Sequence, residues 1–387
     1  MLSTKKSNAV VGLDVEAGSV AAAEVAGNGH VAVGKFGIVP LGPGVFREGE
    51  VADPEALGEA LKELFSKDKL SKNVRVGLAS QRVAVRTLRL PEIDSSAELE
   101  TAIRFQAQDQ IPMPLDHAVL DWQVVGHAMS ENGQRQVDVV AVAARRDMVA
   151  GLMDALNRAG LRPIGIDLSA FGMIRALARG RHAPVDPGDY VDAPVLAEPT
   201  DGEGVRGEAE AEAGSAASLS PEGGQARLYC NLGDVTNLAV ARGTACLFTR
   251  ISPFGVEGIA QRLAERQQLS LEHARQWLVH VGLVKPLGEI EGDADTIPAA
   301  REALAEGAAR LVDELRLSLE YYAAQEAAVP IEGVVACGPG TAIPGLVERL
   351  QRDLGQRFEI GRPRALAHLD DPTAARLTLS FGLALEE

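Results

Sequence analysis

The chain of 387 residues has few of the residues that mark several large classes of protein. Its three cysteines, Cys230, Cys246 and Cys337, are too few and too scattered for a disulfide framework or a CxxC metal site. Its seven histidines form no HExxH or similar ligand spacing. No apolar run approaches the ~18 residues of a membrane-spanning helix. We therefore expect buried thiols in a reducing cytoplasm and a chain that does not itself cross a membrane.

Positive charge is also scarce. Lysine and arginine number 38 against 54 aspartate and glutamate residues, which gives a net charge of −16. Because nucleic-acid binding needs clustered cations, this balance argues against a nucleic-acid partner. Much of the acidic excess lies in residues 186–224, where Pro, Gly, Ala and Ser dominate and no apolar periodicity survives. We interpret residues 181–225 as an acidic, disordered linker or loop that acts as a solvated spacer.

The rest of the chain has an α/β pattern that opens twice in the same way. Strands are predicted over 9–14, 19–25 and 31–39, and a second strand-turn-strand unit over 227–232 and 236–241. Residues 83–167 follow a β-α-β-β-α-β order, which suits a small subdomain with a split βαβ layout. Helices are predicted over 54–65, 96–109, 147–158, 256–267, 271–281, 299–325 and 344–354.

The first turn of each half is a candidate site for phosphate groups. The turns Gly12–Ser19 and Asn231–Asn237 each carry glycine and aspartate between two strands. Two such turns that face each other across a cleft can offer backbone N–H groups to an anion. A late strand that leads through Gly338-Pro339-Gly340 into a helix adds a third element. Each element alone is also typical of an ordinary turn, so the prediction depends on their combination.

With these segments in this order, the chain resembles the actin-like ATPase superfamily and, within it, the PilM family of type IV pilus assembly proteins, which are related to FtsA. The most specific match is the segment 110–116, Gln-Ile-Pro-Met-Pro-Leu-Asp, which is similar to the family's IPxPLD segment. Further matching segments are 12–15, 91–103, 120–123, 137–145, 159–163, 315–322, 338–346 and 380–385. The resemblance implies a two-lobed actin-like fold, a duplicated ribonuclease-H-like α/β architecture.

The resemblance also implies how the domains divide. The first lobe would span 9–180 and hold an extra small α/β subdomain at about 83–167. The second lobe would span 226–376, after the acidic segment 181–225. The segment 377–387 would return to the first lobe.

ATP and Mg²⁺ are the ligands that the resemblance implies for the cleft, with Asp14 on the metal side and no catalytic residue assigned. The residues carried over to the nucleotide are Asp14, Gly18, Ser19, Gly233, Asp234, Thr236, Gly338, Gly340 and Thr341. Several positions depart from the family pattern, which has a serine-rich first turn followed by lysine, an aspartate at the second turn, and Glu and Lys beside the nucleoside. The departures are Glu16, Ala21, Asn231, Arg275, Leu278 and Pro339. They favour a partly degenerate cleft with little hydrolysis.

The family resemblance implies a partner as well. Its members are cytoplasmic scaffolds that bind the short N-terminal tail of the bitopic inner-membrane protein PilN, so membrane association would come through the partner. We place the tail-binding groove at Phe105, Ile111 and Met113, although Phe105 is also compatible with a second-face core residue. The oligomeric state stays open, with a homo-oligomer as one alternative.

Two other functions are weighed against the scaffold. An active ATP-dependent enzyme such as a sugar kinase would need an intact phosphate lysine and a catalytic aspartate, and the sequence offers no such set. An FtsA-type cell-division protein usually ends in an amphipathic membrane helix. The short acidic end at 377–387 disfavours that alternative.

Overall fold

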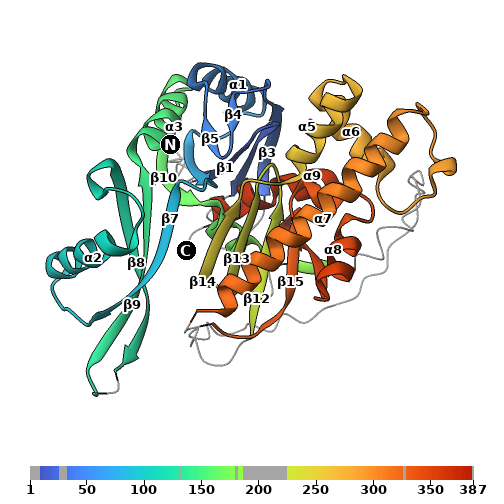
Figure 1. Cartoon of the computed structure of the whole chain (residues 1–387). Coiled ribbons are helices and arrows are strands. Elements are labelled where there is room, and N and C mark those ends of the chain that lie inside the picture. Colours follow the sequence, from blue (N-terminus) through green and yellow to red (C-terminus); the bar gives the residue numbers. More distant parts are fainter. Residues whose placement is uncertain are drawn as a thin grey trace, which may run out of the picture.

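The computed structural model describes residues 9–25, 33–130, 132–178, 182–185, 225–325 and 328–385. They form two lobes, each built on one mixed sheet (Figure 1). The first sheet has the strand order β10-β6-β1-β2-β3, in which β1, β2 and β3 are antiparallel while β6 and β10 are parallel to β1. Its strands are β1 (Val10–Glu16), β2 (Ser19–Val25), β3 (Val33–Pro40), β6 (Asn73–Leu78) and β10 (Arg162–Leu168).

The second sheet repeats this topology. Its order is β11-β16-β15-β12-β13-β14, again an antiparallel three-stranded meander followed by two strands parallel to the first. An extra strand, β11, pairs antiparallel with β16 at the edge. The strands are β11 (His182–Val185), β12 (Ala226–Leu232), β13 (Thr236–Arg242), β14 (Ala245–Ser252), β15 (Ile331–Cys337) and β16 (Phe358–Pro363).

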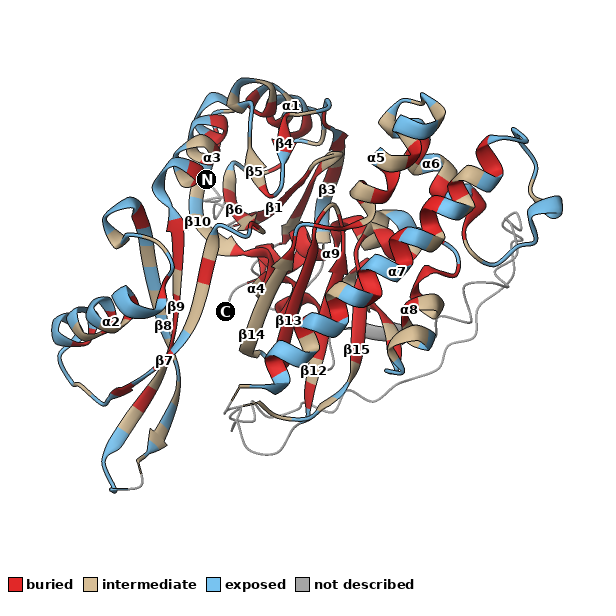
Figure 2. Ribbon diagram, viewed as in Figure 1, coloured by how far each residue is buried: buried red, intermediate tan, exposed pale blue. Residues whose placement is uncertain are grey.

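Helices cover both sheets and fill the space between them. α1 (Pro54–Lys67) and α3 (Arg146–Arg158) pack on the outer face of the first sheet. α4 (Ser169–Leu177) and α9 (Asp371–Ala384) follow the last strand of each sheet and lie between the two sheets, where Figure 2 shows them almost wholly buried. The outer face of the second sheet carries α5 (Val256–Gln267), α6 (Leu271–Val281), α7 (Thr296–Ala323) and α8 (Leu346–Leu354).

The two central helices come close because both carry glycine at their contact. A Cβ on Gly382 of α9 would collide with the carbonyl of Gly172 on α4. Around this crossing, apolar side chains from β2, β13 and β15 join those of both helices in one core that ties the lobes together. Among the described residues, no helix is both long and apolar enough to span a membrane.

The extra subdomain is a separate three-stranded sheet of order β7-β9-β8 with one helix on it. It consists of β7 (Val83–Pro91), α2 (Ser96–Gln110), β8 (Ala118–Met129) and β9 (Arg135–Arg145). The predicted split βαβ layout over 83–167 is therefore wrong for its last helix and strand. These elements belong to the first sheet, where α3 packs on α1 and β10 pairs with β6. Two parallel strands need a long crossover connection, and α3 supplies the helix of that crossover.

Most predicted helices are confirmed. α5 and α6 have the predicted bounds, and α1 begins after Asp53, whose side chain accepts hydrogen bonds from two helix N–H groups. The strands β14 and β16 and the helices α4 and α9 were not predicted. β11 lies inside the segment interpreted as a disordered linker, and residues 186–224 lie outside the described residues. The short elements are β4 (Phe46–Arg47), β5 (Glu50–Val51) and 3₁₀ turns at Leu115–His117, Leu287–Glu289, Pro339–Ala342 and Arg364–Leu366.

Candidate functional site

The two glycine- and aspartate-bearing turns do face each other. The backbone N–H of Ala17, in the β1–β2 turn, donates to Asp234 Oδ2 in the β12–β13 turn at 2.9 Å. A cavity of about 350 Å³ opens beside this contact. Its lining comes from both lobes and includes Glu16, Gly18, Ser19, Ile38, Pro40, Asp234, Val256, Glu257, Glu272, Arg275, Leu278, Val279, Pro339, Ile343 and Arg376.

A buried arginine from α9 lies at the centre of this cleft. Arg376 Nη1 is 2.5 Å from Asp14 Oδ2, and its Nε donates to Ser19 Oγ at 2.8 Å. Nη2 donates to the carbonyl oxygens of Ser19 at 2.8 Å and Asp14 at 3.2 Å. Glu16 Oε2 lies 3.7 Å from Nε. The guanidinium therefore binds the strand ends on both sides of the first turn.

Burial also changes the protonation of the acidic groups around Arg376. Desolvation raises the pKa of Glu16 to about 8, although the charge of Arg376 acts in the opposite direction. Desolvation likewise raises the pKa of Asp234 to about 6, against the effect of two backbone N–H donors. At neutral pH the Glu16 carboxyl is thus largely protonated, which reduces the charge gathered around one guanidinium.

The predicted nucleotide residues occupy different places. Asp14 is engaged by Arg376, while Gly18, Ser19 and Asp234 line the cleft. Thr236 is fully buried, and its hydroxyl donates to the carbonyl of Phe254. Thr341 donates both its hydroxyl and its N–H to the carbonyl of Gly338. The two threonines therefore brace their own turns.

Three of the four predicted glycines, Gly233, Gly338 and Gly340, have steric roles. Gly338 has a φ of +86°, and a side chain there would meet Asn231. A Cβ on Gly340 would come within 2.7 Å of Leu232 Cβ. A Cβ on Gly233 would meet the carboxyl group of Glu16. All three glycines therefore sit where the backbone of one turn packs tightly against its neighbours.

Two positions that depart from the family pattern, Ala21 and Arg275, show which cations lie beside the first turn of the cleft. Ala21, where the family has lysine, faces the core between the lobes and has no exposed surface. The cation beside the first turn comes from Arg376 on α9 instead. Arg275 lies over Gly18 and binds Glu257 through two hydrogen bonds of 2.8 and 2.6 Å. Sequence reasoning missed Arg376, although a lone cation in an otherwise apolar helix was a usable signal.

As arranged here, the residues do not fit a nucleoside triphosphate with Mg²⁺. Four carboxyl groups and two guanidinium groups line the cleft, and the guanidinium groups are already paired with carboxylates. The N–H of Ala17 is taken by Asp234. In the part of the chain that the structure describes, no group of three or more His, Cys, Asp or Glu side chains is placed to hold a metal ion.

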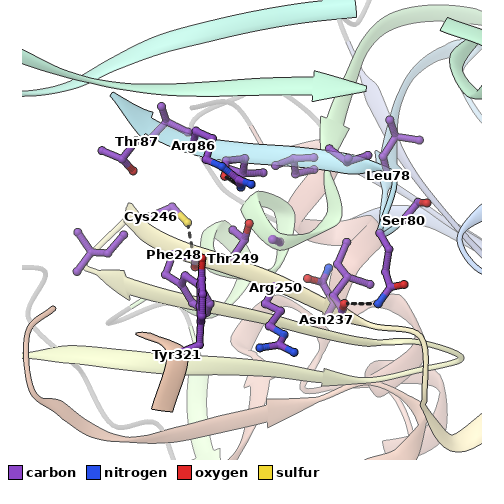
Figure 3. A pocket seen from close by; sticks show the side chains of 18 of the residues that line it. Leu78, Ser80, Arg86, Thr87, Asn237, Cys246, Phe248, Thr249, Arg250 and Tyr321 are labelled. Atoms are coloured by element: carbon purple, nitrogen blue, oxygen red, sulfur yellow. Dashed lines mark hydrogen bonds between the residues drawn. The ribbon is translucent and has the colours of Figure 1, made fainter. Parts of the chain in front are cut away.

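A larger groove of about 800 Å³ lies between the extra subdomain and the second lobe (Figure 3). One wall is β7 with neighbouring residues, including the apolar Val83, Val85 and Val140. The other wall is β14, with Tyr321 at the end of α7. Arg86 and Arg250 are the charged groups among the described lining residues, so the groove is locally positive in a strongly acidic chain.

Both walls of the groove are strand edges. β14 ends the second sheet and β7 ends the subdomain sheet, and neither has a partner strand on its outer side among the described residues. On β14, the carbonyl of Ile251 accepts a hydrogen bond from the side-chain amide of Gln81 at 3.2 Å. Since N–H and C=O of alternate residues point to the same edge of a strand, the main-chain groups of Thr249 face the groove too.

The three residues predicted to bind a partner lie on α2 and after it, outside this groove. Phe105 is 73% exposed on the surface of α2. Ile111 is buried in the subdomain core, and Met113 packs against that core while partly exposed. One of the three is thus a surface aromatic residue and the other two are associated with the subdomain core, and none of the three lines the groove.

The duplicated sheets, the two central helices and the cleft between facing turns are those of an actin-like fold. A solved structure described as a PilM–PilN type IV pilus biogenesis complex has the same fold, with a TM-score of 0.72 and 24% identity over 97% of this chain and 97% of that chain. The model of the family "type IV pilus assembly protein PilM" matches residues 12–188. The resemblance to this family is thereby confirmed.

Two further structures align with lower scores. The ethanolamine utilization protein EutJ from Carboxydothermus hydrogenoformans has 12% identity and a TM-score of 0.48, over 97% of this chain and 88% of that chain. MreB 5 of Spiroplasma citri bound to AMPPNP has 11% identity and a TM-score of 0.48, over 97% of this chain and 94% of that chain.

Proposed function

We propose that this chain is an actin-like scaffold of a type IV pilus assembly complex, on the cytoplasmic side of the inner membrane. In this role it binds the cytoplasmic N-terminal tail of a PilN-like bitopic protein. The family match over residues 12–188 supports the pilus assignment. The likeness to a PilM–PilN complex over 97% of the chain is consistent with a scaffold that works through a partner.

The observation that carries the proposed tail binding is the groove between β7 and β14. It has apolar lining residues and two strand edges that lack a partner strand among the described residues, which are the features that favour binding of an extended peptide as an added strand. The amide of Gln81 already donates to Ile251, at a position where a peptide N–H would donate in an added strand. We propose that the tail displaces Gln81 and pairs with β14.

A proline on the edge strand tests this proposal. Thr249→Pro removes an N–H that faces the groove while leaving the β13–β14 ladder intact, because the N–H groups on the two sides of a strand alternate. Binding of a synthetic tail peptide from the PilN-like protein of the same organism, measured by calorimetry, should weaken by about tenfold or more, or 1.4 kcal/mol. Thr249→Val keeps the N–H and should bind like the wild type.

The helix α2 is the other proposed location for the tail. Met113→Glu places a charge against the core cluster that contains Ile111, and it should abolish binding only if the tail lies at this location. Equal binding by Thr249→Pro and the wild type, with unchanged melting curves, would remove β14 from the proposal. A loss of binding in Met113→Glu alone would then locate the tail on α2.

We further propose that the nucleotide cleft is partly degenerate and that the scaffold does not depend on hydrolysis. The pairing of Arg376 with Asp14 supports this, because it uses both the cation and the carboxylate that a bound nucleotide and its metal would need. Calorimetry with ATP and Mg²⁺ tests it. Tight binding accompanied by phosphate release would contradict the proposal.

A further inference from the structure

One buried polar side chain in the β7–β14 groove has no hydrogen-bond partner in the part of the chain that the structure describes. Asn237, on β13, is 1% exposed, and neither its amide nitrogen nor its amide oxygen has a hydrogen-bond partner among the described residues. It lines the groove, and Figure 3 shows its amide beside the β14 wall. In the register of the sheet it stands opposite Ile251, the residue whose carbonyl accepts from Gln81.

An orphaned amide at this position is costly. Burying a polar group without a hydrogen bond is unfavourable, and an isosteric apolar residue would avoid the penalty. The side-chain amide of asparagine offers donors on nitrogen and an acceptor on oxygen. Its natural complement is another amide, which offers the same two functions in the reverse arrangement.

We propose that Asn237 forms hydrogen bonds with an amide group of the segment bound in the groove and is a specificity-determining residue of that site. This rests on the proposed function, because it requires a tail in the groove. The amide group is either a main-chain peptide group or the side-chain amide of an asparagine or glutamine in the tail. Gln81 lines the same end of the groove, and its side-chain amide donates a hydrogen bond to the carbonyl of Ile251. The strand edge at this end of the groove therefore already binds one amide group.

The first test pairs stability with affinity. Asn237→Leu removes the orphaned amide but keeps the number and branching of the side-chain heavy atoms, so the variant should melt at the wild-type temperature or above it while binding the tail peptide about tenfold more weakly. Asn237→Ala serves as a second variant and should show the same loss of affinity, whatever its stability. Gln106→Leu is the matched control, because Gln106 Oε1 is also unpartnered but lies on α2 outside the groove.

Two sets of tail peptides then distinguish the sources of the amide. Replacing single peptide bonds by esters removes main-chain N–H groups, and replacing Asn and Gln by Leu removes side-chain amides. The substitution that removes the group bound by Asn237 should weaken binding to the wild type by about tenfold but leave binding to Asn237→Leu unchanged. This loss of sensitivity in the variant identifies the contact.

The outcomes separate the two proposals. If the wild type binds the peptide and Asn237→Leu binds it equally well, the role of Asn237 is overturned while the tail groove stands. If Asn237→Leu is strongly destabilised, the amide has a structural partner such as a bound water, and the inference is also overturned. If the wild type binds no tail peptide, the proposed function itself fails.

Discussion

At the scale of single residues, the cleft depends on one buried cation. Arg376 is surrounded by Asp14, Glu16 and Asp234, and it also fixes Ser19. Removing one partner of a buried ion pair is costly, because the remaining charges lose their compensation. A neutral side chain of similar length therefore reveals how much the cleft depends on this guanidinium.

We predict that Arg376→Met lowers the free energy of unfolding by about 3 to 5 kcal/mol, measured by urea denaturation. The free energy of unfolding of Arg376→Lys should lie between those of Arg376→Met and the wild type. Lysine keeps the charge, but its ammonium group cannot reproduce the forked contacts of the guanidinium. Asp14→Asn combined with Arg376→Met should recover part of the loss. A change below about 1 kcal/mol in the single variant would mean that the ion pair adds little.

The raised pKa of Glu16 predicts how stability depends on pH. Because the folded pKa of about 8 exceeds the ordinary value of 4.5, the folded state binds more protons than the unfolded state between these pH values. The free energy of unfolding should therefore fall as pH rises through this window. Asp234 acts in the same direction up to about pH 6. The charge of Arg376 lowers the pKa of both acids but reverses neither shift.

The variant Glu16→Gln should flatten this dependence. Relative to the wild type, it should gain at least about 1.4 kcal/mol, the value of one pKa unit, between pH 5 and pH 8 in urea titrations. Asp14 and the side chain of Asn231, which also face Glu16, remain unchanged in the comparison. Parallel pH profiles for the two proteins would show that Glu16 titrates normally.

The sequence predicts site residues that lie in one local segment better than residues whose partners are far away along the chain. Asp14, Ser19 and Asp234 lie in glycine-bearing turns, so local pattern indicated them as site candidates. Arg376 lies 362 positions beyond Asp14, and no periodicity connects them. Asn237 was also missed, because a polar residue in a strand looks the same with or without a hydrogen-bond partner.

At the scale of elements, helices with a cap and one apolar face were predictable. Ser95 and Ser270 accept hydrogen bonds from the first turns of α2 and α6 and mark their starts. α4 was missed because it is buried on nearly all sides and has no polar face to set a period. β14 was missed because all but its last residue are half-buried, without a clear alternation.

The acidic segment gives a prediction about elements. Residues 186–224 have too few apolar side chains to offset the entropy of ordering. Replacing them with a short Gly/Ser link should leave the melting temperature within a few degrees. Extending the deletion to residue 182 removes β11 and its pairing with β16, and should lower the melting temperature further. A large drop for the shorter deletion would mean that the segment packs on a lobe.

At the scale of the whole molecule, the duplicated plan was predictable but the limits of the subdomain were not. Each half opens with a strand-turn-strand unit that the sequence displays directly. The assignment of α3 and β10 to the first sheet depends instead on which strand β10 pairs with, and the order of elements along the chain is the same in either arrangement. α9, which packs against β1, β2 and β6 from the far end of the chain, likewise appears only in three dimensions.

The contact between the lobes leads to a last prediction, for nucleotide binding. Glu16 lies under Gly233 of the opposite turn, so any triphosphate entering the cleft meets a carboxyl group that ionises near pH 8. Glu16→Ser restores a small hydroxyl side chain, and affinity for MgATP measured by calorimetry should rise by about tenfold at pH 9, or 1.4 kcal/mol. The gain should shrink at pH 6, where the wild-type carboxyl is protonated.

The matched control is Ala21→Lys, which supplies the lysine of the family pattern. Because Ala21 faces the core between the lobes, this lysine would be buried among apolar side chains, and the variant should lose stability without gaining affinity. A Glu16→Ser protein whose affinity for MgATP equals that of the wild type at both pH values would show that Glu16 does not limit binding. The pairing of Arg376 with Asp14, rather than the first turn, would then remain as the feature of this cleft that limits the affinity for MgATP.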